Sequence, residues 1–298
     1  MPAMVFPEGV CAAQEKLFIP EELTPLFHTP VYPRLTAEQR RRYNQLHALW
    51  FNEQIMFFET VLGRRILDAL LREPWPERIA DGLRQFRAEE ERHTEMFRRL
   101  NRRYAPRFYD ARDHHFIRVP ALWRTLFEWM VDHPGWFPLF FWLMLIQEER
   151  SLFFSRCYLA RAEAIEPRFV KAHRLHLADE MGHVSWDEEL IDVLWERAHP
   201  LLRKLNARLF AWMLGELFST PKRGQLCVID ELARELPEIR PLQPEMRRQL
   251  LALATDEAYR SSLYSREIVP KTFARFDGSP ELRALDLCGY RPLPAGVR

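Results

Sequence analysis

Apolar and polar residues follow one another along most of the chain with the three- to four-residue spacing of an α-helix. This spacing predicts four long helices, over about 38–71, 78–104, 137–164 and 168–197. Shorter or further helices are expected over about 122–131, 201–218 and 244–268, followed by a proline-containing tail. Thr36 has the residue type of an N-cap, and the Pro74-Trp75-Pro76 segment and Pro167 mark turns between helices.

Signals for β-structure are weak throughout. The 298 residues include only 10 glycines, and no Asn-Gly or Asp-Gly turn joins two alternating apolar runs. No linker or low-complexity segment divides the chain. We therefore predict one all-α domain over residues 1–298, with a helical bundle over about 37–197 and additional helices and a tail over 198–298.

Composition narrows the class of protein further. With 47% hydrophobic and 29% charged residues the chain has ample material for a core, which excludes disorder as its main state. The net charge of +1 offers no basic field for nucleic acid or for a membrane surface. The four cysteines lack metal-knuckle spacing, and no secretory signal or spanning apolar run is visible, so we expect a cytoplasmic protein with reduced thiols.

Two of the long helices repeat one short motif. Glu89-Glu90-Glu91-Arg92-His93 and Asp179-Glu180-Met181-Gly182-His183 both read acid-Glu-x-x-His. At about 100° per residue, a Glu and a His three positions apart lie on one helix face and can reach the same ion. One Glu-x-x-His is common on a solvated helix face, but paired units are the way in which helix bundles hold two metal ions.

Each unit needs a further carboxylate from the partner helix of its hairpin. Glu59 and Glu149 each precede the Glu of their unit by 31 positions, with a turn near each midpoint. Residues equidistant from the turn of an antiparallel hairpin lie at the same height, so we expect these carboxylates to face the motifs. Glu53 could take the place of Glu59, and Glu148 could take the place of Glu149.

A third histidine belongs to the same face. His176 precedes Glu180 by four residues, and His173 lies on that face one turn earlier. The expected metal ligands are four carboxylates and three imidazoles: Glu59, Glu90, His93, Glu149, His176, Glu180 and His183. Four carboxylates balance two divalent ions, and a set without thiolate suits iron or manganese.

Two other features qualify this interpretation. Asp179 and Glu89, each next to an expected ligand, could orient imidazoles of the opposite half, or could form surface ion pairs. The aromatic run over 136–158 is typical of a core, although some of its rings could line a pocket for a flat aromatic substrate.

These residues resemble the ferritin-like di-iron N-oxygenases typified by p-aminobenzoate N-oxygenase. That family carries two Glu…Glu-x-x-His units and one more His four residues before the second unit, as in Glu59…Glu90-x-x-His93 and Glu149…His176…Glu180-x-x-His183. The resemblance implies a ferritin-like four-helix bundle whose two irons, or manganese in one or both positions, activate O2 and oxidise an arylamine to a hydroxylamine and toward nitro. It also implies a homodimer, a small-molecule substrate and an electron donor. Ligand spacing alone leaves open a di-iron C-hydroxylase or desaturase and an iron-oxidising storage protein, and no motif identifies substrate-binding residues.

Overall fold

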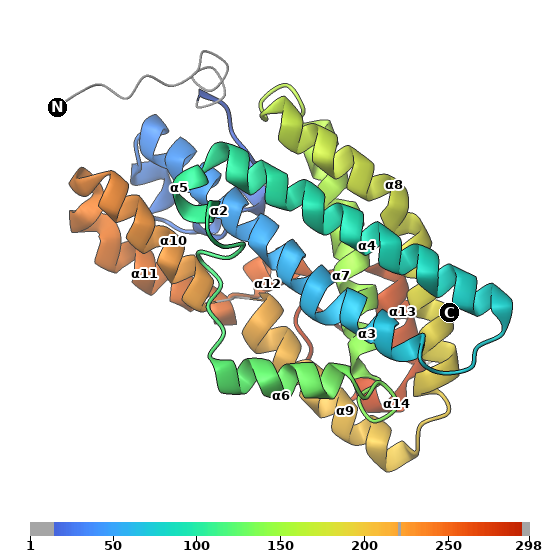
Figure 1. Ribbon diagram of the computed structural model, residues 1–298. Helices are drawn as coiled ribbons and strands as arrows, with labels where there is room; N and C mark the ends of the chain where they lie inside the picture. The colour runs from blue at the N-terminus through green and yellow to red at the C-terminus, as the bar shows by residue number, and fades with distance from the viewer. Residues whose placement is uncertain (1–14, 220–221, 294–298) are drawn as a thin grey trace.

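A computed structural model describes residues 15–219 and 222–293, and these residues form helices and no β-strand (Figure 1). The all-α prediction is confirmed. The α-helices are α2 (Ala37–Phe57), α3 (Arg64–Leu70), α4 (Glu77–Tyr104), α5 (Pro106–Tyr109), α6 (Ala121–Val131), α7 (Leu139–Ala160), α8 (Pro167–Leu190), α9 (Pro200–Met213), α10 (Lys222–Glu235), α11 (Gln243–Ala252), α12 (Glu257–Leu263), α13 (Pro270–Gly278) and α14 (Pro280–Arg283). π-helical turns extend three of them, over Phe58–Gly63, Ile191–Trp195 and Leu214–Ser219.

Two helical hairpins form the bundle. In the first, α2 passes through the π turn Phe58–Gly63 into α3, and the chain returns as α4. In the second, α7 returns as α8, and the two helices pack along their length. Helix α4 contacts both α2 and α8, so the hairpins lie against each other (Figure 1). The result is the four-helix arrangement that the motif spacing predicts.

Local sequence explains where the bundle helices begin. Thr36 caps α2 through a reciprocal capping box, in which its hydroxyl accepts from the Gln39 N–H and the Gln39 side chain accepts from the Thr36 N–H. Helix α8 begins with Pro167, whose missing N–H is no loss at the first helical position, and the Glu166 carboxylate accepts from the Arg168 N–H.

The C-terminal part departs from the predicted elements. The helix expected over 244–268 is broken after Ala252, and Asp256 caps a separate helix, α12, by accepting from the Tyr259 N–H. Helices α10 and α13 occupy segments for which the pattern gave no helix. They pack on the bundle, α10 against α2 and α13 against α7, so burial against the bundle outweighs weak local signals.

The hydrophobic core consists of two clusters of buried side chains with a polar layer between them. Along α4, Leu83 and Phe86 belong to one cluster, and Phe97 and Leu100 to the other. Helix α8 repeats the pattern, with residues 169–172 in the second cluster and residues 184–190 in the first. Both Glu-x-x-His motifs fall in the intervals between the clusters, so the fold holds them in a layer sealed by apolar side chains at each end.

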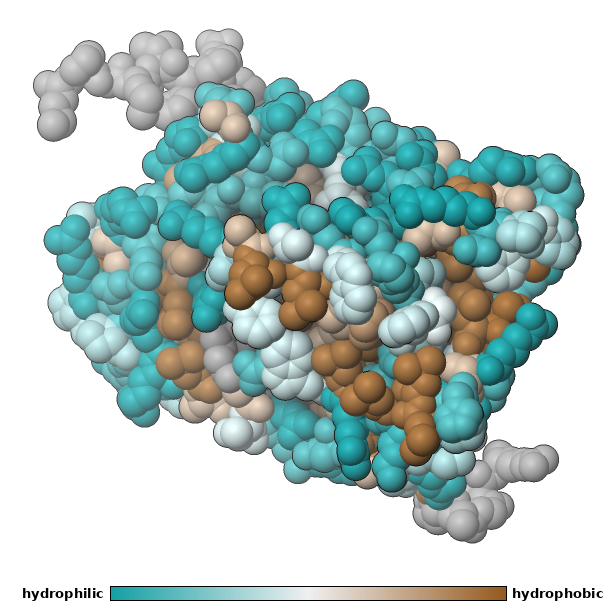
Figure 2. Space-filling view, turned by 60° about the horizontal axis from the view of Figure 1, so that its bottom comes forward, coloured by the Kyte–Doolittle hydropathy of each residue, from teal (hydrophilic) through white to brown (hydrophobic). Residues whose placement is uncertain are grey.

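Large apolar side chains are also exposed on one face. Figure 2 shows apolar side chains gathered on the side of the molecule that carries α6 and α9. Those exposed on these two helices include Leu122, Trp123, Leu126, Trp129, Leu201, Leu205 and Trp212. In the part of the chain that the structure describes, no helix combines the length and hydropathy needed to cross a bilayer.

Candidate metal centre

Seven buried side chains from all four bundle helices converge in the polar layer. Their exposed fraction is at most 5%. They are Glu59 in the π turn that follows α2, Glu90 and His93 on α4, Glu148 on α7, and His176, Glu180 and His183 on α8. Single π-helical turns within helices are rare and occur frequently at functional sites.

One end of the cluster is built around Glu59. The Nε2 atom of His176 lies 2.6 Å from Oε1 of Glu180 and 3.3 Å from Oε1 of Glu59. The Nδ1 atom of His93 lies 3.5 Å from the same oxygen of Glu180 and 3.8 Å from that of Glu59. These four side chains offer ligand atoms that all lie within 4.8 Å of one another.

The other end is built around Glu90 and Glu148. The Nδ1 atom of His183 lies 3.3 Å from Oε1 of Glu90 and 3.4 Å from Oε2 of Glu180. Glu90 groups with His93 and His183, and Glu148 groups with Glu180 and His183. Because Glu180 and His93 belong to groups at both ends, the arrangement is compatible with two adjacent ion positions that share ligands.

The chemistry of these atoms fits bound cations. Four buried atoms that face the cluster have no hydrogen-bond partner among the described residues: Oε2 of Glu90, Nδ1 of His93, Oε2 of Glu180 and Nδ1 of His183. Burial, followed by repulsion from neighbouring carboxylates, raises the pKa of Glu90 and that of Glu148 well above the usual range. Carboxylates this close need compensating positive charge to be ionised together, and two divalent ions would supply it.

Residues outside the cluster orient the imidazoles. The Nε2 atom of His93 lies 3.0 Å from Oδ2 of Asp179, and that of His183 lies 3.0 Å from Oε2 of Glu89. A carboxylate acceptor places the proton on Nε2, so the Nδ1 lone pair of each ring is directed into the cluster. Asp179 and Glu89 thus each contact a histidine of the opposite hairpin.

Two hydroxyl groups, which the motif spacing did not single out, add to this outer layer. The Thr94 hydroxyl donates to Oε2 of Glu59 at 3.0 Å. The Ser151 hydroxyl lies 3.1 Å from Nδ1 of His176, on the side of the ring away from the cluster. Thr94 lies one helical turn after Glu90, an expected ligand, and Ser151 lies one turn after Glu148, the alternative to Glu149. Both hydroxyl groups could have been found by asking which of them share a helix face with these carboxylates.

Glu149 is the one expected ligand that the structure places elsewhere. Its carboxylate accepts hydrogen bonds from the backbone N–H groups of Lys271 and Thr272 and from the Thr272 hydroxyl, at 2.7–2.9 Å, and so caps the start of α13. Glu148 takes the position in the cluster instead. Adjacent residues of a helix differ by only 1.5 Å in height but by 100° in direction, so equal spacing from a turn could not separate the two.

Glu53 and His173, which share the spacing of a ligand, both lie outside the cluster. The Glu53 carboxylate accepts from the Tyr109 hydroxyl and from the backbone N–H groups of residues 115–117. The His173 ring stacks on the Tyr158 ring with centroids 3.6 Å apart, and its Nδ1 lies 3.3 Å from the Ser155 hydroxyl. Glu53 therefore holds a connecting segment, and His173 belongs to the packing beside the cluster.

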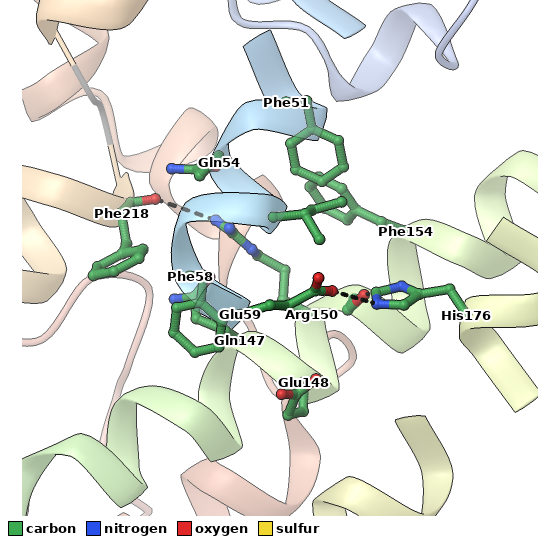
Figure 3. A pocket seen from close by; sticks show the side chains of 12 residues that line it. Phe51, Gln54, Phe58, Glu59, Gln147, Glu148, Arg150, Phe154, His176 and Phe218 are labelled. Atoms are coloured by element: carbon green, nitrogen blue, oxygen red, sulfur yellow. Dashed lines mark hydrogen bonds and ion pairs between the residues drawn. The ribbon is translucent and has the colours of Figure 1, made fainter. Parts of the chain in front are cut away.

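A pocket adjoins the Glu59 side of the cluster (Figure 3). It is partly open to solvent, and its space for the centre of a water molecule is about 40 Å³. Glu59, Glu148 and His176 form its inner wall, and aromatic rings, including Phe51 and Phe154, line its sides. The aromatic run of α7 thus contributes both core and pocket, and a small flat molecule in this pocket would lie beside the cluster.

Comparison with known families agrees with this geometry. The sequence profile of the family "P-aminobenzoate N-oxygenase AurF" matches residues 6–226, which include all seven side chains of the cluster. No curated protein matches the chain. Because the profile covers well over half of the chain, this protein belongs to the p-aminobenzoate N-oxygenase AurF family.

Proposed function

We propose that this protein is a di-iron oxygenase that uses O2 to oxidise the amino group of a small aromatic amine to a hydroxylamine and onward toward nitro. The observation that carries the proposal is the convergence of unpartnered atoms of Glu90, His93, Glu180 and His183 in a buried layer of the described structure. Membership of a family of N-oxygenases supports the choice of a nitrogen target.

The donor set favours iron, with manganese as the other candidate. Seven carboxylate and imidazole side chains, Glu59, Glu90, His93, Glu148, His176, Glu180 and His183, would hold the ions. Hard oxygen donors mixed with imidazole suit these two metals, whereas structural zinc sites usually include thiolate. When bound, the metal pair supplies the binding and reduction of O2, which no side chain of the protein can perform.

The protein would orient the substrate and shield the metal ions from water. The two apolar clusters would shield the ions from water at both ends of the polar layer. The rings of Phe51 and Phe154 would hold an aromatic substrate, with its amino group toward Glu59, Glu148 and His176. Holding the two reacting groups in a fixed orientation lowers the barrier of the step that joins them.

The proposed reaction needs partners outside this chain. Conversion of R–NH2 and O2 to R–NHOH and water consumes two electrons and two protons that the amine does not supply. We therefore propose a separate reductant, which delivers both electrons before O2 binds. The homodimer implied by the family resemblance stays a prediction. Size-exclusion chromatography with light scattering tests it.

Single-turnover chemistry tests the proposed function. The protein is loaded with ferrous iron under nitrogen and mixed with oxygenated 4-aminobenzoate, and the products are identified by mass spectrometry. We expect the hydroxylamine or nitro product from wild type and from Glu91→Gln, an exposed neighbour of the cluster, and none from Glu90→Gln. Hydroxylation of ring carbon, or steady oxidation of added ferrous iron without an organic product, would contradict a nitrogen oxygenase.

A further inference from the structure

One cation, Arg150, is buried in the wall of the pocket. It lies two residues after Glu148 on α7, and only 7% of its surface is exposed. Among the described residues, no carboxylate oxygen lies within 4.0 Å of its guanidinium. Its Nη1 atom donates to the Phe218 carbonyl at 3.1 Å and to the Tyr264 hydroxyl at 2.9 Å, and both of these acceptors are neutral.

Neighbouring residues hold the guanidinium in place while leaving it part of the pocket wall. It lies over the Phe154 ring and the Tyr264 ring, 5.5 and 5.2 Å from their centroids. The Gln147 amide donates to the same Tyr264 hydroxyl at 2.9 Å. In Figure 3 the side chain of Arg150 extends toward Phe218, away from Glu148. Its head group is therefore held beside Phe218 and Tyr264 and not beside Glu148.

Arg150 also lines two adjoining pockets. It lines the pocket beside the cluster and a neighbouring hollow that extends toward Leu23 and Tyr259, and Phe154 lines both. This position suits a group that selects and orients a substrate.

The charges of the loaded site leave Arg150 uncompensated. The four cluster carboxylates, Glu59, Glu90, Glu148 and Glu180, balance two divalent ions. The guanidinium then remains as an extra positive charge in a mostly apolar pocket, which is unfavourable unless an anion accompanies it. A guanidinium is planar and offers paired N–H donors, so a planar carboxylate matches it best.

We propose that Arg150 is a specificity-determining residue, whose guanidinium binds a carboxylate of the substrate and thereby directs the opposite end of the molecule to Glu59, Glu148 and His176. This inference rests on the proposed function, because it deepens the substrate class of the same site. It also assigns a role to Tyr264, which positions Arg150 and lies outside the part of the chain that the family profile matches.

Equilibrium binding tests the proposal without any turnover. The affinities of 4-aminobenzoate and of the neutral 4-aminobenzamide for the ferrous protein are measured by calorimetry under nitrogen. Wild type should bind the carboxylate about 10- to 100-fold more tightly than the amide, and Arg150→Gln should abolish this preference. Arg156→Gln, on an exposed side chain of the same helix, should retain it. Equal affinities in wild type, or an intact preference in folded Arg150→Gln, would overturn the proposal.

Two further variants test the proposal if Arg150→Gln does not fold. Arg150→Lys keeps the charge without the planar fork and should keep a reduced preference for the carboxylate. Tyr264→Phe removes one hydroxyl that accepts from Nη1 and should also weaken the preference for the carboxylate. An unchanged preference in either variant would contradict the role of the guanidinium. A carboxylate preference without oxidation of any amine would contradict the proposed function alone, whereas amine oxidation without that preference would contradict the Arg150 inference alone.

Discussion

Glu148 and Glu149 are consecutive residues of α7, yet their carboxylates serve different structures. That of Glu148 lies in the cluster with Glu180 and His183, and that of Glu149 caps α13 through the N–H groups of Lys271 and Thr272. One residue of helical rotation therefore separates a candidate metal ligand from a structural contact between the bundle and the C-terminal helices.

This relationship yields a matched pair of substitutions. Glu148→Gln should lower the metal content of the reconstituted protein, because it removes one anionic ligand from the cluster. Glu149→Gln should keep the metal but lower the free energy of unfolding by about 1–3 kcal/mol, since it removes a charged acceptor of three hydrogen bonds. Metal analysis and urea denaturation of both variants check the prediction. Loss of metal in Glu149→Gln with full metal in Glu148→Gln would reverse the assignment.

The carboxylates behind the histidines should tune metal affinity. Asp179→Asn and Glu89→Gln remove the acceptors that hold His93 and His183, and each should weaken metal binding by about 10- to 100-fold. Competition with a chromogenic chelator measures the affinity. Glu91→Gln is the control, because Glu91 is exposed and lies on the same helix as Glu89. Unchanged affinity in both acidic variants would mean that these contacts do not position the rings.

Gly63 leaves room for a cluster carboxylate. A Cβ atom at this position would lie 3.1 Å from Oε2 of Glu90, so Gly63→Ala should push that carboxylate aside and lower metal affinity. Alanine favours a helix over glycine by about 1 kcal/mol, so the fold itself should not be weakened. Gly182→Ala on α8, whose Cβ would meet no atom within 4 Å, serves as the matched control. Equal metal affinity in both alanine variants would contradict the close approach.

A buried histidine away from the cluster should make stability depend on pH. Burial lowers the pKa of His47 to about 4, and its Nδ1 lies 3.1 Å from Oε1 of Gln225. Between about pH 4 and 6.5 the unfolded chain binds a proton that the folded protein does not. The resulting stabilisation, at most about 3 kcal/mol, is complete above about pH 6.5 and is lost as the pH falls toward 4.

Urea denaturation at several pH values checks this effect. His47→Gln cannot titrate, so the stability difference between wild type and this variant should shrink as the pH falls through that interval. If the difference in free energy of unfolding between the two proteins stays constant from pH 7 to pH 4, His47 does not cause the pH dependence of stability.

The long helices and six of the seven cluster side chains could be predicted from sequence, because helical periodicity fixes which residues share a face. The rest depended on contacts between distant segments. Equal spacing from the turns favours Glu149 over Glu148, because spacing carries no information about α13, whose backbone N–H groups bind the Glu149 carboxylate. Arg150 gave no signal, since its position in the pocket depends on Tyr264, more than 100 residues later in the chain.

The proposed function requires a pair of iron ions in the layer between the two hairpins. Anomalous diffraction at the iron edge, from crystals of iron-loaded protein, locates these ions. We predict two peaks close together among Glu59, Glu90, His93, Glu148, His176, Glu180 and His183, with the carboxylate of Glu149 still on α13. Iron-loaded crystals with no peak inside this cluster, or with iron bound only at surface carboxylates, would contradict a di-iron centre in this layer.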